Sequence, residues 1–369
     1  MSRRVRGVAD VGVVGAGIVG LSTAVAVAER GASVTVYERG LPGAAQSGGE
    51  SRIFRHAHDD ERLVALACEA RGIWREWEER FGVELLSAEG ALAIGPAAER
   101  RLDVLRRAGG VDVREVGADE VAERLPPLAP WSGPAILDAD GGVIRARAAI
   151  GALAAAVGGS LVADEVLSVR ATSGGAEVRA GGVTAEHAAV VVCAGRGTAA
   201  LARGAGLSLP VRHAAHVRST YRLRGGPAAR LACLQDSSAA FGELGAYGDP
   251  LPGNEEYAVG LGEATVREDG SLLEPADLAA AVERTNGYVT RALPGLEPAP
   301  VGVRHCWVTE LPWAHDAIAV WHAAPLLFAA GNNLFKHAPA LGRALARAAL
   351  GEAPATAFAP ERRLGEPAE

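Results

Sequence analysis

Three glycines near the N-terminus have the spacing of a site for a dinucleotide phosphate. Gly15, Gly17 and Gly20 form the pattern GxGxxG between an apolar run and a helix-like segment. The first glycine permits a tight turn, the second lets a pyrophosphate approach the backbone, and the third lets the helix pack on the strand. Free N–H groups and the helix dipole favour an anion there. Glu38 ends the next apolar run and can accept hydrogen bonds from ribose hydroxyls. The alternative is a glycine-rich packing turn in an unrelated α/β protein.

Two arginines, a cysteine and a lysine stand in short segments elsewhere in the chain. Arg52 and Arg55 follow a glycine pair, Cys306 follows two basic residues, and Lys336 precedes a run of small apolar residues. An arginine can bind a carboxylate through two parallel hydrogen bonds, and a lysine supplies a compact positive charge. Taken singly, each arginine is more simply a surface ion pair, and the cysteine an inert buried thiol.

The hydrophobic pattern predicts the elements that position these residues. A strand at Asp10–Val14, a helix at Ile18–Arg30 and a strand at Ser33–Tyr37 form a βαβ unit, which implies a parallel sheet. A second amphipathic helix is expected at Arg62–Phe81, and Lys336 is expected just before a final helix. The remaining expected helices are Ala148–Val157, Pro275–Leu293 and Ala338–Leu350, and the remaining strands are Leu161–Val169, Ala176–Ala180, Ala189–Cys193, Pro210–Leu223, Glu256–Gly262 and Leu326–Ala330.

The order of these elements predicts an α/β fold with two domains. Segments rich in βα units at both ends enclose segments that read as short strands. We therefore expect a Rossmann-like dinucleotide-binding domain assembled from residues 1–85, 139–208 and 318–369. A β-rich α+β substrate domain would take residues 86–138 and 209–317. A contiguous Rossmann domain in the first half of the chain would indicate NAD. Helical periodicity gives way to strands by residue 83 instead, which favours FAD.

Composition places the chain among globular proteins. Its 369 residues carry a net charge of −7, with 22% charged and 49% hydrophobic residues. The acidic balance argues against nucleic acid or an anionic membrane surface as a partner. Glycines interrupt the apolar stretch near the N-terminus, so a signal peptide or membrane anchor is not expected. Four widely spaced cysteines indicate neither a disulfide framework nor a zinc site. We expect a cytoplasmic protein without a bound metal, as a monomer or a small homo-oligomer.

Together these motifs resemble the D-amino-acid oxidase superfamily, and within it the group of monomeric sarcosine oxidase and N-methyltryptophan oxidase. The likeness rests on Ser51–Ala57 (SRIFRHA), on Cys306 with Thr309, and on Leu334–Gly342 (LFKHAPALG). It implies FAD as the cofactor, attached through a thioether from Cys306 to the flavin 8α-methyl carbon. The cysteine would react as a thiolate, which a neighbouring cation would favour. Because adjacent residues of a strand point to opposite faces, only one of Arg304 and His305 can help directly.

The resemblance also implies roles for the other residues of the site. Arg52 would lie against the flavin ring, while Arg55 and Lys336 would clamp the carboxylate of the substrate. Lys336 and the adjacent helix N-terminus would also place positive charge beside the pyrimidine end of the flavin. The remaining residues matched to cofactor contacts in the family are Glu38, Arg39, Ser51, Val166, Ala194, Gly195 and Gly331.

One strand departs from the family pattern. Members of the group carry a lysine above flavin N5, which promotes reaction with oxygen, and a histidine four residues later. The matching positions here are Gly260 and Ala264. Loss of that cation should slow reoxidation unless another group replaces it. A tyrosine near the second arginine in the group is His58 here, which indicates a different substrate pocket.

These observations predict an FAD-dependent oxidation of a C–N bond in a small carboxylate-bearing amine, giving an imine, with oxygen as the acceptor. The substrate would be an amino acid, an N-methyl amino acid or a cyclic imino acid. The same chemistry run as a dehydrogenase with another acceptor is the first alternative, and a non-catalytic flavin-binding protein is the second. An NAD-dependent dehydrogenase is the least favoured.

Acid precipitation tests the predicted link at Cys306. We expect the yellow colour of the wild-type protein to stay in the pellet, since a thioether survives unfolding. In Cys306→Ala the colour should move to the supernatant, whereas Cys68→Ala should behave as the wild type. The absorption spectra of both fractions give the result. A yellow supernatant from the wild-type protein would contradict the thioether and leave FAD as a non-covalent cofactor.

Overall fold

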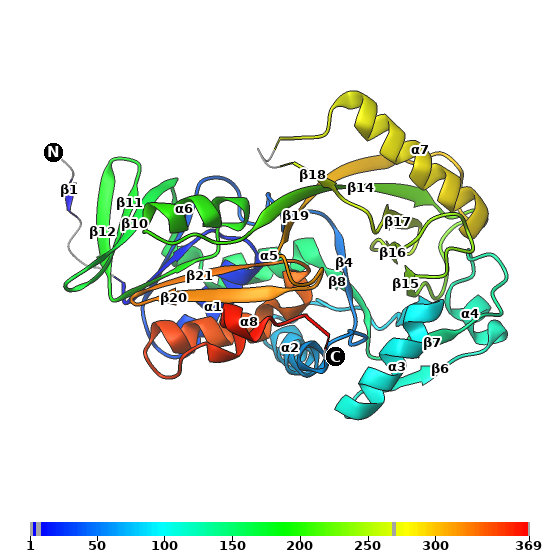
Figure 1. The fold of residues 1–369 in the computed structure, drawn as a ribbon, viewed down its shortest axis with the longest axis horizontal. Helices are drawn as coiled ribbons and strands as arrows, with labels where there is room; N and C mark the ends of the chain where they lie inside the picture. Colours follow the sequence, from blue (N-terminus) through cyan, green and yellow to red (C-terminus); the bar gives the residue numbers. More distant parts are fainter. Residues whose placement is uncertain (1–2, 5–8, 268–270, 368–369) are drawn as a thin grey trace.

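Two large β-sheets lie side by side along the longest axis of the molecule (Figure 1). The computed structural model describes residues 3–4, 9–267 and 271–367. A six-stranded sheet carries most of the long helices, and a nine-stranded sheet forms the opposite end. The mixed α/β architecture predicted from the sequence is confirmed.

The six-stranded sheet consists of apolar runs that are buried on both faces. Its order is β20 (Ile318–Ala323), β21 (Leu326–Gly331), β13 (Ala189–Val192), β2 (Val11–Val14), β3 (Val34–Glu38) and β9 (Leu161–Ala163). Neighbouring strands are parallel except β20, which is antiparallel to β21. Every residue of β2 and β13 is buried. This is the pattern of a parallel sheet that is covered on both sides.

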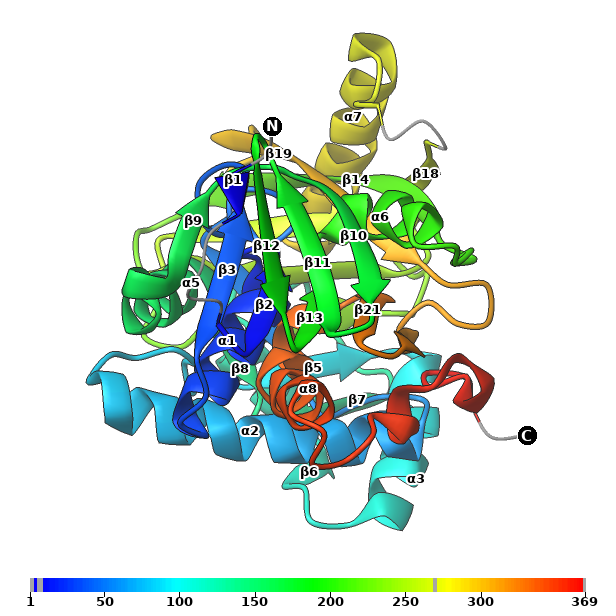
Figure 2. The ribbon, with the colours of Figure 1, turned by 90° about the vertical axis from the view of Figure 1, so that its left-hand side faces the viewer.

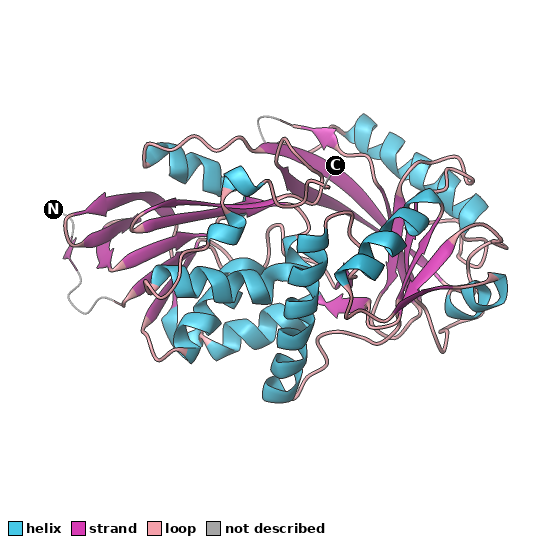
Figure 3. Cartoon of the chain, turned by 60° about the horizontal axis from the view of Figure 1, so that its bottom comes forward, coloured by secondary structure: helices cyan, strands magenta, loops and turns pink. Residues whose placement is uncertain are grey.

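A group of helices packs under one face of this sheet (Figure 3). They are α1 (Ile18–Glu29), α2 (Glu61–Phe81), α5 (Ala146–Ala156) and α8 (Leu334–Ala349). Their apolar side chains share one core with the sheet, and the stripe predicted on α2 places Trp74 and Trp77 in that core. Helices α1 and α8 touch at Gly342, where a Cβ would lie 2.7 Å from atoms of Ser22. A larger residue there would force the two helices apart.

A small antiparallel layer covers the opposite face (Figure 2). It contains β10 (Val166–Thr172), β11 (Gly175–Ala180) and β12 (Val183–His187), with β1 (Arg3–Arg4) beside β12. Helix α6 (Thr198–Gly204) lies next to this layer, and the two share a core with the upper face of the six-stranded sheet. Short 3₁₀ turns occur at Gly158–Ser160, Gly195–Gly197, Thr356–Phe358 and Pro360–Arg362.

The nine-stranded sheet has its own core and three helices of its own. Its strands are β5 (Ala91–Ile94), β6 (Val113–Glu115), β7 (Ala135–Asp138), β14 (Arg212–Arg222), β15 (Cys233–Asp236), β16 (Ala246–Pro250), β17 (Glu256–Leu261), β18 (Thr265–Val266) and β19 (Gly302–Glu310). Helices α3 (Pro96–Ala108), α4 (Ala118–Arg124) and α7 (Pro275–Ala292) pack around it. A ribbon of β4 (Ser51–Phe54) and β8 (Gly142–Arg145) lies between the two large sheets.

Two predicted boundaries are wrong for identifiable reasons. The single strand expected at Leu161–Val169 is two strands, because β9 extends the six-stranded sheet and β10 belongs to the small layer. Helix α8 begins at Leu334, so Lys336 lies in its first turn and not before it. Pro339 suggested a later start, since proline usually occupies the first helical position. Here it lies inside the helix.

Among the residues that the structure describes, no helix combines the length and the apolar character that crossing a bilayer requires.

Candidate functional site

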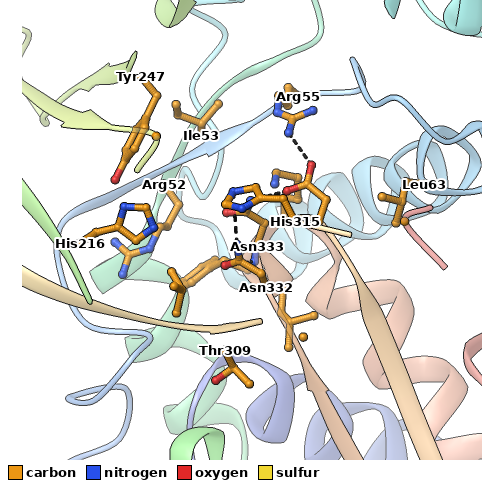
Figure 4. Close-up of a pocket in the computed structure, with 18 of the residues that line it drawn as sticks. Arg52, Ile53, Arg55, Leu63, His216, Tyr247, Thr309, His315, Asn332 and Asn333 are labelled. Carbon is orange, nitrogen blue, oxygen red and sulfur yellow. Dashed lines mark hydrogen bonds and ion pairs between the residues drawn. The ribbon is translucent and has the colours of Figure 1, made fainter. Parts of the chain in front are cut away.

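A cavity of about 600 Å³ lies where the two large sheets meet. Its lining includes Gly17, at the N-terminus of α1, together with Arg52, Arg55, Cys306 and Lys336. One wall comes from β14, β16 and β19 of the nine-stranded sheet, and the other from α1, β4, β21 and α8. Figure 4 shows side chains from these elements around a common space. The fold therefore brings Arg52, Arg55 and Lys336, the three residues that the resemblance assigns to catalysis, to one cavity.

The glycine turn between β2 and α1 has the shape of a phosphate cradle. A Cβ at Gly20 would lie 1.9 Å from the carbonyl oxygen of Gly15, and Gly15 itself has a φ of +99°. Neither position accepts a larger residue. Glu38 accepts a hydrogen bond from the N–H of Ala16 at 2.8 Å, so the acid at the end of β3 fixes the turn. Helix α1 carries no acidic residue in its first turn, which leaves its dipole available to an anion. These features fit the pyrophosphate of FAD.

The other predicted cofactor residues fall into two groups. Gly195 and Gly331 line the cavity at the ends of β13 and β21, where positive φ angles or close backbone contacts favour glycine. Arg39 instead forms an exposed ion pair with Glu165 at 3.2 Å. Arg39, Val166, Ala194 and Ser51 do not line the cavity. Gly15, Gly20 and Glu38 lie outside the lining as well, but they shape the glycine turn.

Cys306 lines the cavity on β19. Its cross-strand partner on β14 is His216, which lines the same wall. Arg304 is two residues away along β19 and lies on the same face, with its guanidinium over the Gly48–Gly49 loop. His305 points away, and its Nε2 accepts a hydrogen bond from the N–H of Leu273 at 3.0 Å. Of the two basic neighbours considered from the sequence, Arg304 is therefore the one on the side of the thiol.

Arg52 is a partly buried cation held by carbonyl oxygens. It donates to the carbonyl oxygens of Ser51 at 2.7 Å and Gln46 at 3.2 Å, and to that of Gly48. Its guanidinium lies 5.6 Å from the centre of the Phe335 ring. Burial lowers the pKa of Arg52, and the nearby Arg218 lowers it further. Among the residues described, no carboxylate forms an ion pair with Arg52, so an anion in the cavity would stabilise it.

Arg218 is a second buried cation that the sequence did not reveal. Its guanidinium donates to the carbonyl oxygen and Oγ of Ser51, each at 3.1 Å, and forms an ion pair with buried Asp249. Arg218 also lies directly across from Gly260 in the β14–β17 pairing. A Cβ at Gly260 would lie 2.5 Å from the Tyr247 ring. The tyrosine therefore occupies the space beside the position where related oxidases carry a lysine.

The far end of the cavity is organised around Asp316. One carboxylate oxygen accepts from Arg55 at 2.7 Å and contacts Nδ1 of His58 at 3.1 Å, and the other accepts from Asn333. Burial alone would raise the pKa of Asp316, but Arg55, His58 and Lys336 hold it well below its usual range. Burial and Arg55 lower the pKa of His58 to about 3, so this imidazole is neutral. The predicted carboxylate clamp thus already contains a carboxylate of the protein.

Lys336 is the cation of this region without a direct partner. It is 4% exposed, lines the cavity, and forms no ion pair and no side-chain hydrogen bond with the described residues. Burial lowers its pKa to about 7, and Arg55 and Arg101 act in the same direction while Asp316 opposes them. Arg101 is itself paired with Asp59 at 3.3 Å. An anion in this region would find in Lys336 a positive charge that no described carboxylate contacts directly.

The buried Arg218–Asp249 pair yields a stability prediction. Arg218→Met should lower the free energy of unfolding by about 3–5 kcal/mol, because it leaves Asp249 buried without its partner. Arg218→Met with Asp249→Leu should recover most of that loss, since it removes both charges. Arg212→Met, which breaks an exposed pair on the same strand, should cost less than about 1 kcal/mol. Denaturant titration measures all three. Equal stability of the single and double variants would contradict the pairing.

Comparison with known proteins agrees with this geometry. The sequence model of the DAO family, described as FAD dependent oxidoreductase, matches residues 10–348. Glycine oxidase from Geobacillus kaustophilus (strain HTA426) is 29% identical over 220 residues. That match covers 55% of this chain and 58% of the relative, so less than two thirds of the relative's length is spanned.

Solved structures share the fold over nearly the whole chain. NikD, an unusual amino acid oxidase essential for nikkomycin biosynthesis, superposes with a TM-score of 0.84, 22% identity and 98% coverage of both chains. L-proline dehydrogenase from P. horikoshii superposes with a TM-score of 0.83 and 19% sequence identity, covering 97% of this chain and 98% of that one. The crystal structure of glycine oxidase from Geobacillus kaustophilus superposes with a TM-score of 0.78 and 22% sequence identity, covering 100% of this chain and 99% of that one. With the family model spanning most of its length, this chain belongs to the DAO family of FAD-dependent oxidoreductases.

Proposed function

We propose that this enzyme oxidises a C–N bond of a small carboxylate-bearing amine to an imine, with oxygen as the acceptor. The observation that carries the proposal is Lys336, a buried cation without a direct partner in the cavity that continues from the glycine turn. A free amino acid, an N-methyl amino acid or a cyclic imino acid would each present the anion that this position lacks. The oxidation by FAD is inferred from the family, and the carboxylate of the substrate is inferred from Lys336.

FAD would be held along the first half of the cavity and would supply the acceptor for the hydride that leaves the substrate carbon. Gly15, Gly17 and Gly20 would admit its pyrophosphate, and Glu38 would bind its ribose. Arg52 is placed to complement negative charge on the ring system. Cys306 opens onto the same wall and would provide the covalent attachment.

The substrate carboxylate would be bound mainly by Lys336. Arg55 uses one N–H on Asp316 and another on the carbonyl oxygen of Ala57, so its remaining donors are secondary contacts. Asp316 is held by three donors and cannot swing away without leaving Arg55 unpaired. This arrangement differs from the clamp by Arg55 and Lys336 expected from the resemblance. Asp316 would occupy the Arg55 donor that the resemblance assigns to the substrate carboxylate. Of the two expected contacts, the one from Lys336 would remain the main one.

One specific observation favours an electron acceptor other than oxygen. Gly260 lies beneath the Tyr247 ring, so no lysine can occupy the position from which related oxidases assist the reaction with oxygen. Electron transfer to an acceptor other than oxygen is therefore the alternative function, with the same oxidation of the amine.

The flavin spectrum tests the proposed function. Purified protein should be yellow and should bleach when a suitable amino acid is added without air, because the bound flavin takes the hydride. Admission of air separates the two acceptors: rapid return of the colour indicates an oxidase, and persistence of the bleached state indicates a dehydrogenase. A protein that cannot be loaded with FAD, or that no amino acid or imino acid bleaches, would contradict the proposal.

Lys336 makes carboxylate binding dependent on pH. It is the only lysine among the 369 residues, so its pKa can be measured from the rate of amine acylation, with the α-amino group as the only other amine. We expect a pKa near 7, because that is where burial places it. Only the ammonium form attracts an anion. Affinity for acetate should be full below this pKa and should fall about tenfold per unit above it.

The flavin absorbance change or protection from acylation measures acetate binding. Lys336→Met should weaken binding at low pH and abolish the pH dependence. A lysine that titrates near its ordinary value, or an affinity for acetate that is constant between about pH 6 and 9, would contradict this role of Lys336.

A further inference from the structure

His216 lies on the wall of the cavity that Cys306 and Lys336 also line. It stands on β14 directly across from Cys306, and its ring meets that of Tyr247 edge to face, with centroids 6.3 Å apart. It is 6% exposed and lines the same cavity as Lys336. Figure 4 shows the imidazole beside Arg52 and below Tyr247.

The hydrogen bonds of His216 leave one ring nitrogen as an acceptor. Nδ1 lies 3.3 Å from the carbonyl oxygen of Leu261, an atom that can only accept, so Nδ1 carries the hydrogen. Nε2 of the neutral ring then has a free lone pair. Within the described residues, no hydrogen-bond partner of Nε2 is found. The atom that lacks a partner therefore belongs to a side chain that lines the cavity.

The groups around His216 keep its ring neutral at physiological pH. Burial lowers the pKa of His216, and His315 lowers it further, while the Leu261 carbonyl and Glu310 oppose them. The charged or titratable groups that face it from the neighbouring elements are Arg52 on β4, Arg218 on β14, Tyr247 on β16, Cys306 and Glu310 on β19, and His315 after β19. Two fixed guanidinium groups among these disfavour a standing positive charge on the ring.

Other acceptors in the cavity are already engaged. Asp316 accepts hydrogen bonds from three donors, and Asp249 is paired with Arg218. Burial raises the pKa of Tyr247 to about 12, so its hydroxyl stays protonated. His315 shares a hydrogen bond of 3.4 Å with Asn332. Neutral Lys336 would also be a base, but the proposed function uses it as the ammonium that binds the carboxylate, which leaves His216 as the candidate base among the described residues.

We propose that His216 takes the proton from the ammonium nitrogen of the substrate. This rests on the proposed function, because an amine loses hydride from its carbon only when the nitrogen is neutral. The N–H bond of the ammonium breaks, its electron pair stays on the nitrogen, and the proton forms a new bond to Nε2 of His216. The imidazolium then returns the proton to water. No electron is exchanged in this step.

The experiment combines a pH profile with a direct view of the imidazole. For wild-type holoenzyme, kcat/KM for an amino-acid substrate should rise with pH through the pKa of His216 and fall again above the pKa of Lys336, where the substrate carboxylate loses its cation. His216→Asn, which keeps a donor for the Leu261 carbonyl, should lose about 100-fold or more at pH 7. That loss should shrink as the pH approaches the pKa of the substrate's own amine. His213→Asn, on the same strand but outside the cavity lining, should match the wild type.

A spectroscopic readout keeps the proposal testable if His216→Asn folds poorly. In protein labelled with ¹⁵N-histidine, an α,α-dialkyl amino acid, which has no Cα–H and cannot be oxidised, should shift the Nε2 resonance of one neutral imidazole, because that nitrogen then accepts a hydrogen bond from the ammonium group. His216→Gln assigns that resonance among the nine histidines.

Three results would overturn the proposal: an unchanged pH profile in His216→Asn, a loss of rate that is equal at every pH, or no shift of an Nε2 resonance in the wild-type complex. The second would indicate a positioning role only. If no amino acid bleaches the wild-type flavin at any pH, the proposed function itself fails, and this outcome is distinct from the other three.

Discussion

Buried positive charge at the junction of the two sheets is the constraint on which the site depends. The charged side chains that line the cavity are Arg52, Arg55, Arg101, Arg218 and Lys336 on one hand, and Asp59, Asp236, Asp249 and Asp316 on the other. Three of these cations are paired with carboxylates. Arg52 rests on carbonyl oxygens, and Lys336 has no direct partner in the described part of the chain. A buried cation without a counter-charge is costly, so the cavity favours anionic occupants.

The fold explains why these two cations lie at different places along the cavity. Arg52 is fixed by β4, between the sheets, where the path from the glycine turn reaches Cys306. Lys336 is fixed by the first turn of α8, beyond it. In the proposed function, Arg52 would complement the cofactor that the family binds, and Lys336 would bind a small molecule beside it. Strand β14 contributes Arg218 and His216 to the cavity wall. The two residues are two positions apart and therefore lie on the same face of the strand.

Local patterns in the sequence were sufficient to predict the elements and the cofactor cradle. The turn at Gly15–Gly20, helix α2 and helix α7 each depend on neighbouring residues, and their predicted bounds lie close to those observed. The charge pairs could not be predicted in this way. Arg55 and Asp316 are 261 residues apart, and Arg218 meets Asp249 only through the order of strands in the sheet. A single sequence gives no signal for such pairs beyond the presence of the two residue types.

The most direct test compares two amines that differ only in the carboxylate. An amino acid that reduces the enzyme and its decarboxylated amine would be mixed in turn with the holoenzyme without air, and the rate of flavin bleaching followed at low concentration of each. If Lys336 binds the carboxylate as proposed, the amino acid should be faster by about 10- to 100-fold, the range expected for one charged hydrogen bond. Equal rates for the two amines would contradict the central claim.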